Sequence, residues 1–126
     1  MRAADTNVVV RLLVRDDPRQ YDQARAFVSG GAWVSLVVLA EAAWVLKGVY
    51  RLEPEDIAQT IEMLLSQSDV VLEAPQTVAD ALVVFRAQPK LGFNDCLILE
   101  IARKAGHLPL GTFDRELAKA EGAQRI

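Results

Sequence analysis

Short runs of strand-forming residues alternate with longer helical runs along the whole chain, and this alternation limits the possible folds more than any other feature. Apolar residues recur at helical spacing between the short runs, as at Ile57, Ile61 and Leu64. Strands separated by helices predict an α/β fold, in which helices cover both faces of a central parallel sheet of four to five strands. We expect strands at 2–4, 32–34, 70–72, 108–111 and 123–126.

The size and composition of the chain predict one domain over residues 1–126. No apolar run reaches the roughly 18 to 20 residues that a membrane span needs, and Asp5 comes too early for a signal peptide. The single cysteine, Cys96, excludes an internal disulfide and is typical of a reducing compartment. We therefore expect a cytoplasmic protein that does not bind a membrane.

The net charge of −3 does not by itself favour a nucleic-acid partner, because phosphate binding needs a basic surface. Several acids gathered in one metal site would, however, leave the rest of the surface close to neutral. Arginines also cluster early in the chain, and Arg11 and Arg15 on the expected first helix are candidate phosphate contacts. Charge alone neither supports nor excludes an RNA partner.

Four carboxylates stand in apolar or tightly packed stretches: Asp5, Glu41, Asp95 and Asp114. Each of the three aspartates could instead cap the helix that follows it. Glu41 lies in the middle of the apolar run 34–46, where a buried, unpaired carboxylate would cost several kcal/mol. It must therefore reach solvent, find a cationic partner or bind a metal ion.

A shared metal site would explain all four acids together. Carboxylates that converge on one pocket repel each other unless a cation lies between them. Oxygen ligands suit Mg²⁺ or Mn²⁺, and such ions can activate water against a phosphodiester. Asp5 and Asp114 follow expected strands, at the edge where α/β sheets bind ligands.

The other reactive side chains do not suggest a catalytic role. Cys96 has no histidine near it in the sequence, so core packing is its expected use.

We expect a helix from a cap at Asn94 through Lys104, with apolar residues facing the core at Leu97, Ile98, Ile101 and Ala105.

Four stretches in order, MRAADTNVVVRLLVRDDP, VSLVVLAEAAWVL, GFNDCLILEIARKAG and GTFDREL, resemble the PIN-domain ribonucleases. The resemblance is closest to the VapC-type toxins of bacterial toxin–antitoxin pairs and covers essentially the whole chain. It implies a PIN-like three-layer α/β/α sandwich. The acidic quartet of the family falls on Asp5, Glu41, Asp95 and Asp114, and supporting polar positions fall on Asn7 and Thr112.

The resemblance also implies an activity and partners. The activity is endonucleolytic cleavage of RNA that depends on one or two Mg²⁺ or Mn²⁺ ions, through attack of water on phosphorus. The partners are an RNA substrate, a VapB-like antitoxin that blocks the acidic pocket, and a second copy of the chain in a homodimer. Asp5 and Asp95 are expected to bind the metal directly, with Glu41 and Asp114 completing the cage.

Three alternatives stay open. A housekeeping RNA-processing nuclease would have the same residues as a toxin. A non-catalytic binding module would keep the fold, although the presence of all four acids argues against it. A phospho-acceptor signalling domain needs adjacent acids after its first strand and a late lysine, whereas Asp5 is followed by Thr6 and Asn7 and no lysine closes the strand near Leu108.

Overall fold

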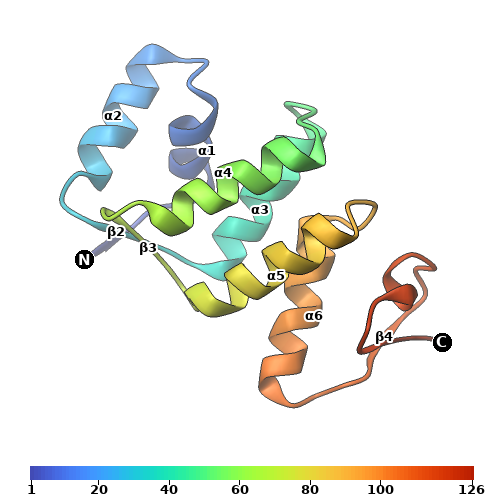
Figure 1. The fold of residues 1–126 in the computed structure, drawn as a ribbon. Helices are drawn as coiled ribbons and strands as arrows, with labels where there is room; N and C mark the ends of the chain where they lie inside the picture. Colours follow the sequence, from blue (N-terminus) through green and yellow to red (C-terminus); the bar gives the residue numbers. More distant parts are fainter. The chain divides into compact units, whose positions relative to one another are not determined.

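The computed structural model describes residues 1–126 and divides the chain into two compact units, Met1–Pro75 and Gln76–Ile126 (Figure 1). The chain forms six α-helices and five short strands, and a pair of successive helices separates each of the first three strands from the next. The expected α/β class with parallel strands is confirmed. The five strands are hydrogen-bonded as two sheets, one of three strands and one of two, and each sheet lies within one unit.

The first unit contains a parallel sheet of three strands in the order β1-β2-β3: β1 is Arg2–Ala3, β2 is Ala32–Val34 and β3 is Val70–Leu72. Ala32 of the central strand is the register partner of Arg2 on one side and of Val70 on the other. In β2 and β3, buried residues flank an exposed one, which is the alternation that a half-buried strand requires. Figure 1 shows β2 and β3 running side by side.

Four helices belong to the first unit: α1 is Thr6–Val14, α2 is Pro18–Val28, α3 is Leu36–Gly48 and α4 is Pro54–Ser66. The α1 helix packs against both α2 and α3, and α3 also contacts α4. Side-chain oxygens of Asp5, Asp17 and Ser35 accept backbone N–H groups at the starts of α1, α2 and α3. These caps satisfy amides that would otherwise have no partner, so local sequence sets where the helices begin.

The second unit contains α5 (Pro75–Ala87), α6 (Phe93–Ala105), β4 (Leu110–Thr112), a single turn of 3-10 helix η1 (Leu117–Lys119) and β5 (Ala123–Arg125). The β4 and β5 strands pair in parallel. Phe85 and Phe93 join α5 to α6 with an edge-to-face ring contact at 5.8 Å between centroids. An ion pair of 3.2 Å between Asp80 and Lys104 joins the same two helices farther along.

The strand predictions are close, but one helix face was predicted wrongly. Gly92, rather than Asn94, occupies the cap position of α6, and Ile98 and Ile101 are largely exposed. Leu97 is buried as expected, but Ala105 is exposed, and the other buried residues of the helix are Phe93, Cys96, Leu99 and Glu100. The prediction placed two isoleucines on the buried face because they are hydrophobic. Hydrophobicity alone could not show that this face includes a carboxylate. None of the helices combines the length and the hydrophobicity that a membrane span requires.

Candidate active site

Asp5 lies two residues after the end of β1 and caps α1. Its Oδ1 accepts the backbone N–H of Val8 at 3.1 Å, while its own backbone is extended, as a cap residue requires. The capping alternative and the metal-ligand prediction are therefore compatible for this residue. Asp5 forms no ion pair, and its exposed carboxylate keeps a second oxygen available for a ligand.

Glu41 lies on the exposed side of α3, so the apolar run around it does not bury it. The buried face of α3 consists of Leu39, Ala42, Ala43 and Leu46. Glu41 accepts a hydrogen bond of 2.8 Å at Oε2 from the hydroxyl of Thr6, and it has no lysine or arginine partner. The carboxylate therefore reaches solvent, and a neutral hydroxyl holds it without neutralising its charge.

Asp5 and Glu41 are thus brought to the same place in the first unit. Thr6 is the residue that follows Asp5, and its hydroxyl binds Glu41 across a packed contact between α1 and α3. Two carboxylates held this way offer only oxygen atoms, which is the donor set that Mg²⁺ and Mn²⁺ prefer. The chemistry of this pair fits the metal that the sequence predicts.

Asp95 and Asp114 both belong to the second unit. Asp95 lies half-buried in the first turn of α6, where a carboxylate is favoured by the helix dipole. Asp114 follows β4, and its Oδ1 accepts the backbone N–H groups of Glu116 at 2.8 Å and Leu117 at 3.1 Å. The capping alternative therefore agrees with the backbone contacts of Asp114, whereas for Asp95 it is wrong, because Gly92 caps α6 and Asp95 lies within the first turn.

The predicted supporting residues differ in what they contact. Thr112 Oγ1 accepts the backbone N–H of Asp114 at 3.0 Å, which orients the start of the turn that carries this carboxylate. Asn7 is exposed on α1. Neither unit holds a group of three or more histidine, cysteine, aspartate or glutamate side chains that could bind a metal ion, and each unit carries two members of the quartet.

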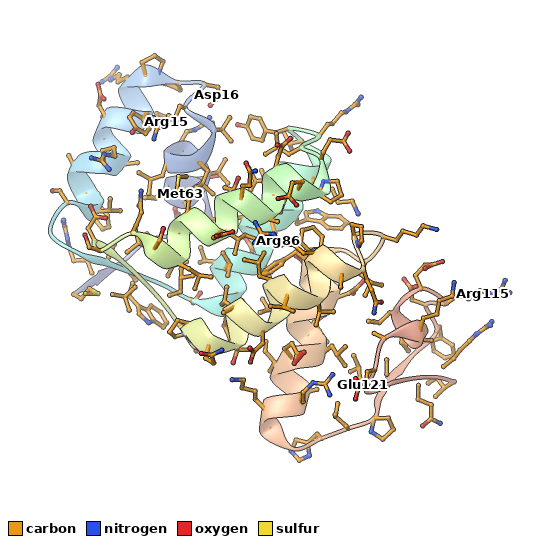
Figure 2. The ribbon with its side chains drawn as sticks, in the orientation of Figure 1. Arg15, Asp16, Met63, Arg86, Arg115 and Glu121 are labelled. Carbon is orange, nitrogen blue, oxygen red and sulfur yellow. The ribbon has the colours of Figure 1, made fainter.

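The two candidate phosphate contacts have partners within the chain. Arg11 Nη1 lies 2.7 Å from Asp16 Oδ1 and 3.2 Å from the hydroxyl of Tyr50. The guanidinium of Arg15 lies over the ring of Tyr21, 4.7 Å from its centroid. Figure 2 shows Arg15 and Asp16 in the loop that connects α1 and α2.

Two functional features escaped the sequence reasoning. Thr6 was passed over in favour of Asn7, although a hydroxyl beside a candidate metal ligand was a usable signal. A pocket of about 400 Å³ also opens beside Asp5 and Asn7, between α1 and α2. Its remaining polar lining comes from Arg11, Gln20 and Gln23, and nothing in the local sequence distinguishes the two glutamines from ordinary surface glutamines.

The chain belongs to the PIN domain family, because the model of that family, described as PIN domain, matches residues 3–123. Members of this family have a nuclease fold, are generally hydrolases of nucleic acid and typically use divalent metal ions. Among curated proteins, none matches the chain at a significant level. Family and fold together make this chain a PIN-domain protein of the α/β class.

Proposed function

We propose that this chain is a metal-dependent endoribonuclease that cleaves RNA through attack of water on a phosphodiester. We also propose that residues 1–126 act as one PIN domain and that the protein is a VapC-type toxin of a toxin–antitoxin pair. The observation that carries the proposal is the Asp5–Thr6–Glu41 arrangement: the hydroxyl of Thr6, the residue after Asp5, binds the carboxylate of Glu41, and neither carboxylate has a cationic partner. The family match supports the nuclease chemistry.

In this proposal Asp5, Glu41, Asp95 and Asp114 are the catalytic carboxylates. Asp5 and Asp95 would hold the metal directly, and Glu41 and Asp114 would complete the cage or hold the waters around it. When bound, one or two Mg²⁺ or Mn²⁺ ions supply a water of lowered pKa and stabilise the charge that develops on the phosphodiester.

The other residues of the site have positioning roles in the proposal. Thr6 fixes one oxygen of Glu41, and the backbone N–H of Val8 fixes one oxygen of Asp5. Thr112 supports the turn that begins at Asp114. Asn7 lies beside Asp5 and is proposed to orient the substrate, while Arg11 and Arg15 are proposed to contact phosphates at the margin of the site.

The toxin role and the partners follow from the resemblance of the four acidic stretches to VapC-type proteins. The proposed partners are RNA, a VapB-like antitoxin and a second copy of the chain, and the proposed location is the cytoplasm. A housekeeping nuclease would share the chemistry but not the partner. Co-expression with the product of the neighbouring gene distinguishes the two, because only a toxin should be silenced by a small DNA-binding protein encoded beside it.

Cleavage of total cellular RNA by the purified protein tests the activity, with Mg²⁺, with Mn²⁺ and with EDTA. Wild-type protein should give discrete fragments with either metal and none with EDTA, and Asp5→Asn should give none. Asp17→Asn is a matched control, because Asp17 caps α2 with the same kind of bond, from its Oδ1 to Gln20 N at 3.0 Å. Fragments from Asp5→Asn at the wild-type rate would contradict the assignment of the site.

A further inference from the structure

We infer that the pocket between α1 and α2 binds an unstacked nucleobase of single-stranded RNA beside the scissile phosphate. This inference rests on the proposed nuclease function, because it places the pocket next to Asp5. The cavity of about 400 Å³ lies at the lower end of the range for sites that take small molecules. Its lining comes from α1, from α2 and from the residue that caps α1, and it includes Asp5, Asn7, Arg11, Gln20, Gln23 and Phe27.

The α2 helix presents an unusual face to this pocket. Gln20, Gln23, Ala24 and Phe27 follow the spacing of one helical stripe, and all four line the cavity. A stripe that packs against a neighbouring helix is normally apolar, yet this one carries two amides beside a buried alanine. Although α1 and α2 pack against each other, the two glutamines line a cavity.

The amides of this pocket are available to a ligand. The side chains of Asn7, Gln20 and Gln23 form no hydrogen bond within the chain. A carboxamide offers a donor and an acceptor side by side, which matches the adjacent acceptor and donor on the edge of a base. Sequence-specific RNA recognition generally uses such contacts to unstacked bases, together with stacking on aromatic rings.

Phe27 supplies the apolar wall of the pocket, and Arg2 fixes its ring. The guanidinium carbon of Arg2 lies 4.0 Å from the centroid of the ring, and Arg2 Nη2 donates to the carbonyl oxygen of Phe27 at 2.8 Å. The cation is exposed and lies beside the cavity, where a phosphate of the same strand would meet it. Apolar wall, amide edge and nearby cation are the three features that a nucleotide requires.

A protein segment is the main alternative occupant, but the observations favour RNA. The pocket is local, and between the carboxylate of Asp5 and the guanidinium of Arg11 its polar lining consists of the neutral amides of Asn7, Gln20 and Gln23. The Arg11 guanidinium on its rim is already engaged by Asp16 and Tyr50, so the amides rather than a charge would provide selectivity. Proximity to Asp5 would place a bound base within one nucleotide of the proposed catalytic carboxylates.

Equilibrium binding of fluorescent homopolymeric RNA oligonucleotides, measured by anisotropy in EDTA, tests the pocket without cleavage. The proteins are wild type, the double variant Gln20→Ala/Gln23→Ala and the matched control Gln59→Ala, which removes an exposed glutamine of α4 outside the pocket. Alanine is the strongest helix former, so the helices should persist. A Gln20→Glu/Gln23→Glu variant keeps the side-chain size and removes the amide donors, and circular dichroism verifies folding.

We expect wild type and Gln59→Ala to prefer one homopolymer, and both double variants to bind it roughly 10-fold more weakly and with less preference. Equal binding of all homopolymers by wild type and variants would overturn the inference, as would no RNA binding by wild type. Cleavage with Mg²⁺ separates the two proposals. If wild type cleaves RNA and the variants bind RNA as wild type does, the nucleobase pocket is rejected and the nuclease proposal stands. If wild type binds one homopolymer selectively but cleaves no RNA, the nuclease proposal is rejected and the pocket stands.

Discussion

Thr6 Oγ1 donates a hydrogen bond of 2.8 Å to Glu41 Oε2 and so joins the first turn of α1 to the middle of α3. The two residues are 35 positions apart in the chain. Because α1 packs directly on α3, this bond fixes the carboxylate of Glu41 relative to Asp5, which immediately precedes Thr6. A position that looks like ordinary helix sequence therefore controls the geometry of the proposed site.

Replacing Thr6 with valine should lower the rate of RNA cleavage about 10-fold while the melting temperature stays nearly unchanged. Valine keeps the branched shape but removes the hydroxyl that orients Glu41. The bond is exposed to solvent, so it should contribute less than about 1 kcal/mol to the free energy of unfolding, whereas a 10-fold loss of rate corresponds to about 1.4 kcal/mol in the activation barrier. Cleavage kinetics and thermal melting measure the two effects. Thr6→Ser should restore most of the activity, and a Thr6→Val protein as active as wild type would show that Glu41 needs no such support.

Two substitutions of Asp5 should separate its roles in capping and in catalysis. Asp5→Asn keeps an oxygen that can accept the N–H of Val8, so the free energy of unfolding should change by only a few tenths of a kcal/mol. Asp5→Ala removes the cap and should cost about 1 kcal/mol. Both should abolish RNA cleavage. Urea unfolding measures the difference, and equal stability of the two variants would exclude the cap as a stabilising contact.

The ion pair within α6 should make Arg103 more important for stability than its position on a helix suggests. Arg103 Nε donates to Glu100 Oε2 at 2.9 Å, and the side chain of Glu100 is only 7% exposed. Arg103 Nη2 also donates to the carbonyl oxygen of Glu121, which lies beside α6 (Figure 2). Arg103→Met should cost about 2 kcal/mol, below the range of about 3–5 kcal/mol for fully buried pairs, since Arg103 is partly exposed.

The matched test of this pair is the double variant Glu100→Gln/Arg103→Met. Glutamine carries no charge, so the double variant should be more stable than Arg103→Met alone in urea unfolding. If the single and double variants unfold at the same urea concentration, an unpaired carboxylate is not the cause of the loss.

Cys96 should resist alkylation in the folded protein. The side chain is fully buried, and burial, followed by the nearby charges of Asp95 and Glu100, raises its pKa from 9.0 to about 12. The thiol therefore stays protonated near neutral pH and cannot act as a nucleophile. Iodoacetamide at pH 8 should modify it only after unfolding in urea, as mass spectrometry would show. Rapid labelling of the native protein would contradict this environment.

The same raised pKa predicts how stability depends on pH. The unfolded state loses the thiol proton near pH 9, whereas the folded state retains it until about pH 12. The stability that the protonated thiol provides is therefore complete below pH 9 and is lost as the pH rises toward 12. The difference in unfolding free energy between wild type and Cys96→Ala should shrink across this window. A constant difference would show that the thiol titrates alike in both states.

Local sequence predicted the elements of this fold well because their signals span only three or four residues. Ser35 caps α3, Pro54 and Pro75 begin helices, and the expected strand at 32–34 is β2. The boundaries of β4 and the cap of α6 differ by two residues, because neighbouring positions could serve almost equally well. The buried face of α6 was predicted wrongly because burial depends on what the helix packs against.

The sequence by itself determined the α/β class and the positions of most helices and strands, and it singled out four carboxylates in apolar or tightly packed stretches as a candidate site. Only the tertiary structure decided that Thr6 holds Glu41, that Gln20 and Gln23 border a cavity beside Asp5, and that Glu100 is buried against Arg103. The physical reason is the separation in sequence over which each signal acts. Caps and periodicity act between residues that are close in sequence, whereas a site and its pocket depend on how separate helices pack, which no short stretch encodes.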